Sequence, residues 1–225
     1  MKKFKWMFLL VVFLFSFVSA AWGAPVCVPG TLADYFVPGF SCSIGDTLFS
    51  DFANLEIPGS ATPIAPSGVM VNPLNDLNGP GFEFVVNKTA QAGEFFDVSI
   101  GYLVSNNTFS GVTLSMAGSS ATGNGAVTTI EDIFYAGNLS ATLILFAIEG
   151  DEFTFDQLTF APVTSIGVIK DIGIDGGPGG TGQLVSATNQ FTVEAPTAIP
   201  EPATILLVAA GLGYLGIRRR RFRLH

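Results

Sequence analysis

Histidine and tryptophan are absent from the interior of this 225-residue chain. The only histidine is the last residue, His225, and the two tryptophans, Trp6 and Trp22, lie close to the start. An interior without histidine lacks the usual general base at neutral pH. An interior without tryptophan lacks the strongest stacking platform for sugar rings and cations. We therefore expect the interior of the chain not to be an enzyme.

Basic residues are also scarce between the two ends. Eight of the ten lysines and arginines lie in the first five or the last eight residues, which leaves only Lys88 and Lys170 in the interior. Because 17 of the 18 acidic residues fall there, residues 24–197 carry a net charge of −15. This charge excludes nucleic acid as a partner, since phosphates require a basic face. It favours solubility and self-repulsion.

The amino-terminal end has the three-part pattern of a signal peptide. Three lysines within the first five residues form a basic start, residues 6–18 are apolar, and small residues follow. Cleavage after Gly23 fits the pattern, as does cleavage two or three residues earlier. The alternative is an uncleaved anchor helix, for which about 13 apolar residues are few. We predict a signal peptide over residues 1–23 and export of residues 24–197 across the inner membrane.

The carboxyl-terminal end combines a short motif, an apolar run and a basic cluster. Residues 203–217 are uncharged and span about 22 Å as a helix, which is short for a bilayer unless the bilayer thins or the helix ends snorkel. A basic cluster after such a run holds its end in the cytoplasm. We predict one transmembrane helix over residues 203–217. The motif before it is Pro200, Glu201 and Pro202, and the basic cluster after it is Arg218, Arg219, Arg220 and Arg221.

This arrangement, over residues 198–225, resembles the PEP-CTERM sorting signal. The resemblance implies that an exosortase-like membrane transpeptidase cuts at or near Pro200-Glu201-Pro202 and discards the helix. It implies transient anchoring in the membrane, then delivery to the cell surface or the extracellular space, and association with exopolysaccharide. The alternative is an ordinary membrane anchor with chance prolines. The resemblance implies where the protein is delivered, but it implies no activity for the interior of the chain.

The interior consists of short runs in which apolar and polar residues alternate, separated by clusters of glycine, asparagine and proline. The pattern predicts an all-β domain over residues 24–197, namely a β-sandwich of jelly-roll-like or immunoglobulin-like type. The 15 phenylalanines between Phe36 and Phe191 would fill its core. Residues 143–148 are apolar on both faces and predict a central strand. The clearest alternating runs are residues 82–86, 96–104, 112–116 and 166–174.

Cys27 and Cys42 are the only cysteines. Export places them in an oxidising compartment, where a disulfide is the default. The alternative is a reactive thiol, but the interior offers no histidine to activate one. We expect the disulfide to fix the amino-terminal segment to the domain.

Acidic residues offer only weak candidates for a metal site or a catalytic site. Asp171 and Asp175 flank a glycine-rich segment, but the third and twelfth positions that an EF-hand loop requires are glycines here. Solvated acids beside a turn are the simpler interpretation. The adjacent acidic pairs at 131–132 and 151–152 point to opposite faces of a strand, unlike a glycosidase pair. We interpret these pairs as charges at strand edges, and we expect no catalytic residue and no cofactor.

We therefore predict an exported protein of the cell surface or extracellular matrix, sorted by an exosortase and without catalytic activity. One alternative is a carbohydrate-binding or calcium-dependent binding module, with Tyr35, Tyr102 and Tyr135 as the tyrosines that could form a platform. The other alternative is a glycan hydrolase, which requires two carboxylates facing each other in a cleft. Extracellular polysaccharide is the partner that the first two interpretations share.

Overall fold

The computed structural model of the protein describes residues 23–55, 61–135 and 138–194, so the predicted signal peptide before Gly23 and the sorting tail lie outside the described residues. The described part is mostly β-strand, which confirms the all-β prediction. Its helices are α2 (Leu32–Tyr35) and the 3-10 turn η1 (Pro66–Gly68). No helix of the described residues has the length and apolar character needed to cross a membrane.

The strands are β1 (Gly30–Thr31), β2 (Ser41–Ile44), β3 (Thr47–Leu55), β4 (Thr62–Pro63), β5 (Met70–Asp76), β6 (Gly79–Ala90), β7 (Phe95–Ala117), β8 (Ser120–Thr122), β9 (Ala126–Tyr135), β10 (Asn138–Ile148), β11 (Asp151–Phe153), β12 (Phe155–Asp175) and β13 (Thr181–Val193).

Two long antiparallel strands, β7 and β12, organise the sheet. The first part of β7, residues 99–105, pairs with β3, whereas its second part, residues 109–117, pairs with β13. The change of partner follows Asn106, which has a φ of 68°, a left-handed conformation that asparagine tolerates better than most residues. Opposite this point, the register between β7 and β12 shifts twice. Strand β7 therefore runs from one group of strands into another.

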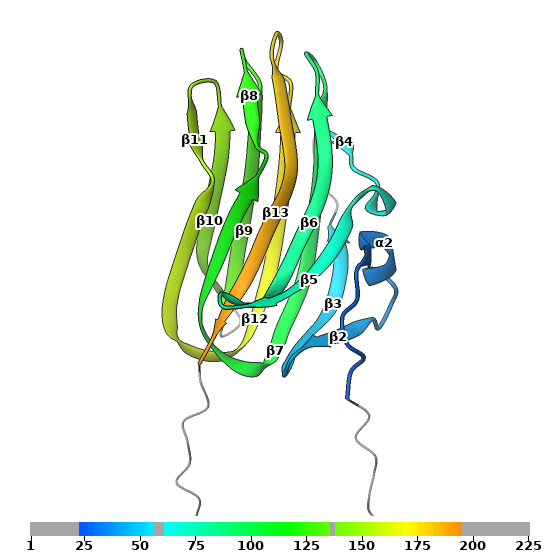
Figure 1. Ribbon diagram of the computed structural model, residues 1–225, viewed down its shortest axis with the longest axis vertical. Coiled ribbons are helices and arrows are strands. Elements are labelled where there is room, and N and C mark those ends of the chain that lie inside the picture. Colours follow the sequence, from blue (N-terminus) through cyan, green and yellow to red (C-terminus); the bar gives the residue numbers. More distant parts are fainter. Residues whose placement is uncertain (1–22, 56–60, 136–137, 195–225) are drawn as a thin grey trace, which may run out of the picture. The chain divides into compact units, whose positions relative to one another are not determined.

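The pairing folds the chain into two layers. The first layer holds β1, β5, β6, β13 and the second part of β7, and the second layer holds β2, β3, the first part of β7, the second part of β12, β9, β10 and β11. Figure 1 shows the strands of both groups running along the long axis of the domain. The finer expectation of a jelly-roll-like or immunoglobulin-like sandwich stays a prediction.

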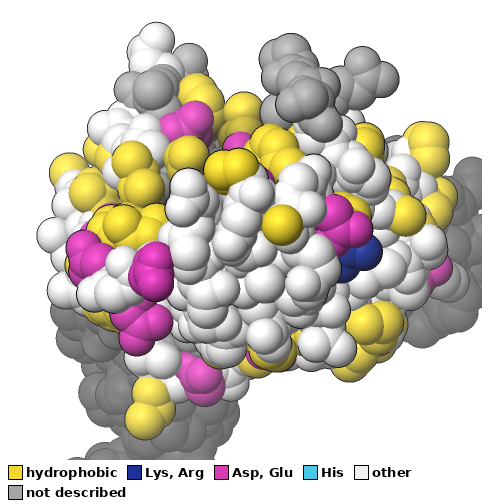
Figure 2. All heavy atoms as spheres, turned by 90° about the horizontal axis from the view of Figure 1, so that it is seen from above, with side chains coloured by type: hydrophobic (Ala, Val, Ile, Leu, Met, Phe, Trp, Pro, Cys, Tyr) yellow, Lys and Arg dark blue, Asp and Glu magenta, His cyan; other side chains and the backbone are white. Residues whose placement is uncertain are grey.

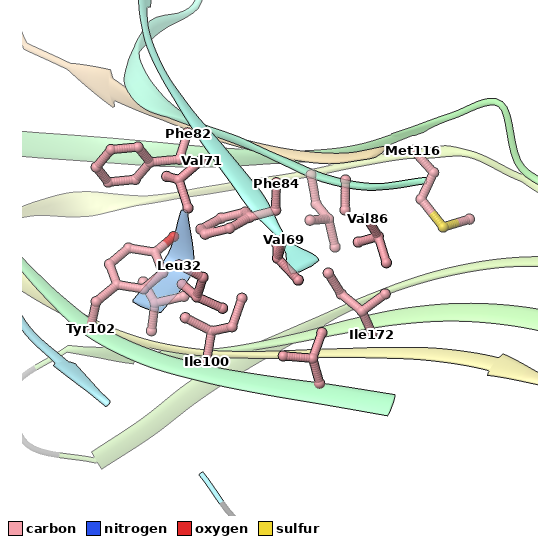
Figure 3. Packing of buried hydrophobic residues seen from close by; sticks show 14 of the residues in the cluster. Leu32, Val69, Val71, Phe82, Phe84, Val86, Ile100, Tyr102, Met116 and Ile172 are labelled. Atoms are coloured by element: carbon pink, nitrogen blue, oxygen red, sulfur yellow. The ribbon is translucent and has the colours of Figure 1, made fainter. Parts of the chain in front are cut away.

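The core lies between the two layers. Figure 3 shows Phe82, Phe84 and Val86 of β6 on one side of the core, with Ile100 and Tyr102 of β7 and Ile172 of β12 on the other. These side chains sit at alternate positions and are buried, as the alternating runs predict. Aromatic rings meet edge to face through the middle of the core, which adds to the gain from burial. The buried phenylalanines are Phe49, Phe52, Phe82, Phe84, Phe109 and Phe191.

The prediction that the phenylalanines as a set fill the core is wrong for three of them. Phe95, Phe153 and Phe155 are exposed, and Phe155 begins the part of β12 whose residues are largely exposed. A period-two pattern identifies which residues share a face, but it does not tell whether a second layer covers that face. These phenylalanines lie on faces that the other layer does not cover.

The prediction of a central strand at residues 143–148 is also wrong. Strand β10 lies between β9 and the three-residue strand β11, close to the end of the pairing path. Leu143 and Leu145 face the core, whereas Ile144 and Ile148 are 49% and 45% exposed on the other face. The strand is apolar on both faces although only one face is covered.

The amino-terminal segment is held to β2 by the disulfide that the sequence predicts. Cys27 and Cys42 are bonded, with a Cα–Cα distance of 4.8 Å, and both are buried. The backbone N–H of Cys27 donates to the carbonyl of Ser43 at 2.9 Å. The Tyr35 hydroxyl donates to the carbonyl of Val28 at 2.7 Å, which holds the same segment from α2.

Replacing both cysteines, as Cys27→Ser with Cys42→Ser, should lower the free energy of unfolding by about 3 kcal/mol, because a cross-link over a loop of 15 residues restricts the unfolded chain. Urea denaturation of the two proteins measures this difference. Reduced wild-type protein is the control, and it should match the variant. A variant as stable as the oxidised protein would contradict the prediction.

Phe82→Ala should lower the free energy of unfolding by about 3–5 kcal/mol, because it removes a fully buried ring and leaves a cavity among Tyr35, Phe49 and Phe84. The matched control is Phe153→Ala, since Phe153 is 45% exposed. Denaturation of both variants should show a much smaller loss for the control. Equal losses would mean that the core does not lie between these layers.

Candidate functional site

Four polar side chains occupy inward positions in the apolar core. Tyr102 lies on β7, Glu131 on β9, Lys170 on β12 and Asn189 on β13. Tyr102 is 4% exposed and the other three are fully buried. Two of the four are ionisable at neutral pH, and such groups are rarely buried unless they are paired.

The four side chains form one connected network. The Lys170 ammonium lies 2.5 Å from Oε2 of Glu131. The Asn189 amide donates from Nδ2 to Oε1 of Glu131 at 2.8 Å and to the Thr113 carbonyl at 3.3 Å. The Tyr102 hydroxyl donates to Oδ1 of Asn189. The amide nitrogen of Asn189 thus contacts acceptors and the amide oxygen contacts a donor, which fixes the orientation of the amide.

The network joins the two layers of the fold. Lys170 and Glu131 are directly opposite each other in the antiparallel pairing of β12 with β9, within the second layer. Asn189 belongs to β13 of the first layer, where it pairs with Leu114 of β7 and Phe82 of β6. One carboxylate of the second layer therefore binds a lysine from its own layer and an asparagine from the layer opposite.

The surroundings of the network are apolar, and this controls its protonation. Burial raises the pKa of Glu131, while the Lys170 ammonium and the Asn189 amide oppose the rise. Burial likewise lowers the pKa of Lys170, against the attraction of the Glu131 carboxylate. Both shifts favour the neutral amine and the neutral acid over the ion pair. A proton can therefore pass between Nζ and Oε2.

Buried ion pairs seldom stabilise a fold, because the loss of hydration offsets the attraction between the charges. An apolar pair at positions 131 and 170 would fill the same space without that loss. The network is therefore better explained by what it can do than by stability alone, and we take it as the candidate functional site.

A second titratable cluster lies on the outer face of the second layer. Asp97 and Asp171 occupy adjacent strands, β7 and β12, and their carboxyl groups lie within hydrogen-bonding reach of each other. Asp97 is 5% exposed, and burial together with the charge of Asp171 raises its pKa to about 7. Within the described residues, Oδ1 of each carboxyl group has no donor. A proton shared between the two carboxyls satisfies both oxygens.

A pocket of about 350 Å³ opens beside this carboxyl pair. Its lining includes Asp97, Ser99, Leu55 and Ile64. Asp97 and Ser99 are the buried polar residues of the lining. The pocket has room for a small polar molecule beside the Asp97 carboxyl group.

The structure does not bring the predicted metal candidates together. Asp171 and Asp175 lie four residues apart on β12, about 13 Å along the strand. Asp171 faces Asp97, whereas Oδ1 of Asp175 accepts a hydrogen bond from the N–H of Gly177 at 2.7 Å. In residues 23–55, 61–135 and 138–194, no group of three or more potential metal ligands occurs. The sorting residues Pro200-Glu201-Pro202 and the arginine cluster lie outside the described residues.

The interpretation of Glu131 as a charge at a strand edge is wrong. Strand β9 pairs on both sides, with β10 and β12, and Glu131 points into the core. Its neighbour Asp132 points outward, as alternation requires, and accepts a hydrogen bond from Thr142 at 2.6 Å. The sequence indicates this site through Lys170, which lies midway between the inward residues Val168 and Ile172 and therefore points to the same face.

The carboxyl pair predicts a dependence of stability on pH. Because the pKa of Asp97 is raised in the folded state, from 3.8 to about 7, the folded state holds a proton that the unfolded state releases. The contribution of this group to stability is therefore complete below pH 4 and is lost as the pH rises through about 7. Asp97→Asn should make the free energy of unfolding less dependent on pH over this range.

Denaturation midpoints measured between pH 4 and pH 8 test this dependence. The matched control is Asp151→Asn, because Asp151 is exposed. The control should keep the slope of the wild-type protein. An Asp97→Asn variant with the same slope would show that the two carboxyls do not share a proton.

Comparison with known proteins identifies a motif at the carboxyl-terminal end of the chain. No curated protein matches the chain. Among solved structures, the enzymatically active domain of tailspike protein 4 of bacteriophage CBA120 is similar to 66% of this chain and to 20% of its own chain, at 13% identity and a TM-score of 0.22. So low a score says nothing about the fold or the activity of this chain.

The tail matches a family model over residues 198–221, which the family describes as the PEP-CTERM protein-sorting motif. The match includes the Pro200-Glu201-Pro202 triplet, the apolar run and the four arginines. The chain therefore carries the PEP-CTERM protein-sorting motif, consistent with a substrate of an exosortase.

Proposed function

We propose that the protein is a structural component of the cell surface or of an extracellular polysaccharide matrix, and that it has no catalytic turnover. The observation that carries this proposal is the sorting motif at residues 198–221. The signal peptide starts export, the carboxyl-terminal helix holds the chain in the membrane, and an exosortase then releases the domain from that helix. The delivered part is the β-sandwich over residues 24–197.

The charge of the domain supports a structural role. Of its two lysines, Lys170 is buried in the core, and Lys88 lies 4.0 Å from the ring centroid of Phe96. Figure 2 looks onto one end of the domain and shows acidic side chains spread over it with very little basic surface. Such a surface repels acidic polymers unless divalent cations bridge the two, while neutral glycans are not repelled. We expect matrix association to depend on divalent cations where the polymer is acidic.

A binding module is the second candidate, and one observation favours it. Tyr135 stacks on Phe160 with ring centroids 4.9 Å apart, and both are only partly buried. Tyr35 and Tyr102 are buried and therefore offer no platform for a sugar ring. A glycan hydrolase fits less well, because retaining glycosidases separate their carboxyl groups by about 5 Å, whereas Asp97 and Asp171 lie within hydrogen-bonding reach of each other.

The sorting motif gives the first test. Replacing Pro200, Glu201 and Pro202 by alanines should leave the carboxyl-terminal helix attached, so the protein should remain in the membrane fraction of its host. Intact mass and cell fractionation measure both effects. The wild-type protein should have lost both ends and should be found at the surface or outside the cell.

Glu194→Gln is the matched control, because it removes an exposed acid shortly before the motif and should be processed normally. Wild-type protein that keeps its carboxyl-terminal helix in the inner membrane would contradict the sorting proposal. Turnover of a glycan by the purified domain would contradict the absence of catalysis.

A further inference from the structure

We propose that Lys170 and Asn189 form an intramolecular isopeptide bond, with Glu131 as the proton carrier and Tyr102 as the donor to the reacting carbonyl. The bond would join the side chains of β12 and β13 and so connect the two layers covalently. This inference concerns the folded domain alone and does not depend on how the tail is processed.

The two reacting groups are held by one carboxylate. Lys170 binds Oε2 of Glu131 at 2.5 Å and Asn189 binds Oε1 at 2.8 Å. Two groups bonded to the two oxygens of one carboxylate lie side by side. The amine and the amide are therefore held close to each other, which lowers the entropic barrier to bringing two reactants together.

The core keeps the lysine in a reactive form. A protonated amine has no free electron pair and cannot attack a carbonyl. Burial lowers the pKa of Lys170 and raises the pKa of Glu131, so the proton can move from Nζ to Oε2. Desolvation also activates lysine as a nucleophile in apolar sites generally. The neutral amine and the protonated acid are the two forms that the reaction needs.

The carbonyl of Asn189 is polarised for attack. Tyr102 donates its hydroxyl hydrogen to Oδ1, the atom on which negative charge develops when Nζ adds to Cγ. A donor aimed at this oxygen in a site without water stabilises the tetrahedral intermediate. Burial raises the pKa of Tyr102 well above its ordinary value, so the hydroxyl keeps its hydrogen at neutral pH.

The leaving nitrogen already contacts the acid that protonates it. The new bond is Nζ–Cγ and the broken bond is Cγ–Nδ2. Glu131 received its proton from Nζ at Oε2, and it delivers that proton to Nδ2, whose N–H group is held at Oε1, as the Cγ–Nδ2 bond breaks. The carboxylate then takes one proton from the attacking nitrogen, so the carboxyl group ends protonated, as it was when the attack began. The products are a secondary amide and ammonia, which leaves as ammonium with the proton that Lys170 first carried. No oxidant, nucleotide or further reactant takes part.

The bond would close a segment that contains the β12–β13 turn. This turn is glycine-rich, and Gly177 has a φ of 57° with its Cα so close to the carbonyl of Asn124 that a Cβ would lie 2.1 Å from that oxygen. The two strands that leave the turn belong to different layers. A covalent bond between them keeps the layers together when the chain is pulled or locally unfolded.

Trypsin digestion provides a direct test, because the interior contains only two cleavage sites, Lys88 and Lys170. The exported protein is purified, reduced, denatured and digested, and the fragments are weighed. We expect cleavage after Lys88 but not after Lys170, since an amidated lysine is not recognised. The fragment that contains both Lys170 and Asn189 should weigh less than its sequence by one ammonia.

Cleavage after Lys170 as complete as after Lys88, with fragments at their full sequence masses, would overturn the proposal. Because this result comes from the wild-type protein, it does not depend on whether a variant folds. Any uncleaved fragment that lacks one ammonia and yields linked fragments of β12 and β13 supports the bond. The cut after Lys88 verifies that the digestion was complete.

Variants assign the roles of the neighbouring groups. Glu131→Gln keeps the shape of the side chain but cannot carry the proton, so cleavage after Lys170 and the full mass should both return. Tyr102→Phe should slow the reaction and leave a mixture. The matched controls are Glu83→Gln and Tyr135→Phe, which lie outside the network and should keep the bond. A Glu131→Gln variant that folds and still loses ammonia would contradict the role of Glu131.

Discussion

The burial of Lys170 is the constraint on which the rest of the structure depends. A lysine amine between two apolar layers requires a partner that binds its proton, and the Glu131 carboxyl group is that partner across β12 and β9 at 2.5 Å. The carboxylate in turn requires a second donor, which is the amide of Asn189. Removing one partner of a buried pair typically costs about 3–5 kcal/mol, because the other charge is left uncompensated. A slip of one residue in either layer would move half of this network to the outer face, so the network also selects the register of the strands.

The change of partner along β7 follows from the same requirement. For Glu131 to reach Asn189, the layers must face each other with their inward side chains in contact, and β7 achieves this by pairing with β3 in one layer and β13 in the other. Asn106 supports the change of partner through its left-handed backbone. Tyr102 lies before the bend and Leu114, the cross-strand neighbour of Asn189, lies after it. The bend in β7 thus places the donor and the acceptor of one hydrogen bond on opposite walls of the core.

Alternation along the sequence predicted which residues share a face but not which strands meet. The inward runs at residues 82–86, 96–104 and 166–174 are correct because each buries one face. Lys170 lies in phase with Ile166, Val168, Ile172 and Ile174, and Glu131 lies in phase with Val127 and Ile133, so the pattern contained the network. The acidic pair at residues 131–132 was expected at a strand edge because an isolated charge belongs in water. Only the pairing of β12 with β9, which no local pattern encodes, shows that each charge has a partner. The prediction for β10 failed for the complementary reason, since an apolar pattern does not reveal that Ile144 and Ile148 stay about half exposed.

The composition of the domain explains why covalent links would be useful in it. A net charge of −15 over residues 24–197 opposes compaction by self-repulsion, and only one of the two lysines reaches the surface to offset it. The disulfide between Cys27 and Cys42 restricts the amino-terminal segment but does not cross from one layer to the other. A bond between Lys170 and Asn189 would act between the layers, where the disulfide does not. It would also need no oxidant, because burial alone brings the amine, the acid and the amide to their reactive forms. For a protein that carries an export and sorting signal, a link made by folding itself remains available wherever the chain is delivered.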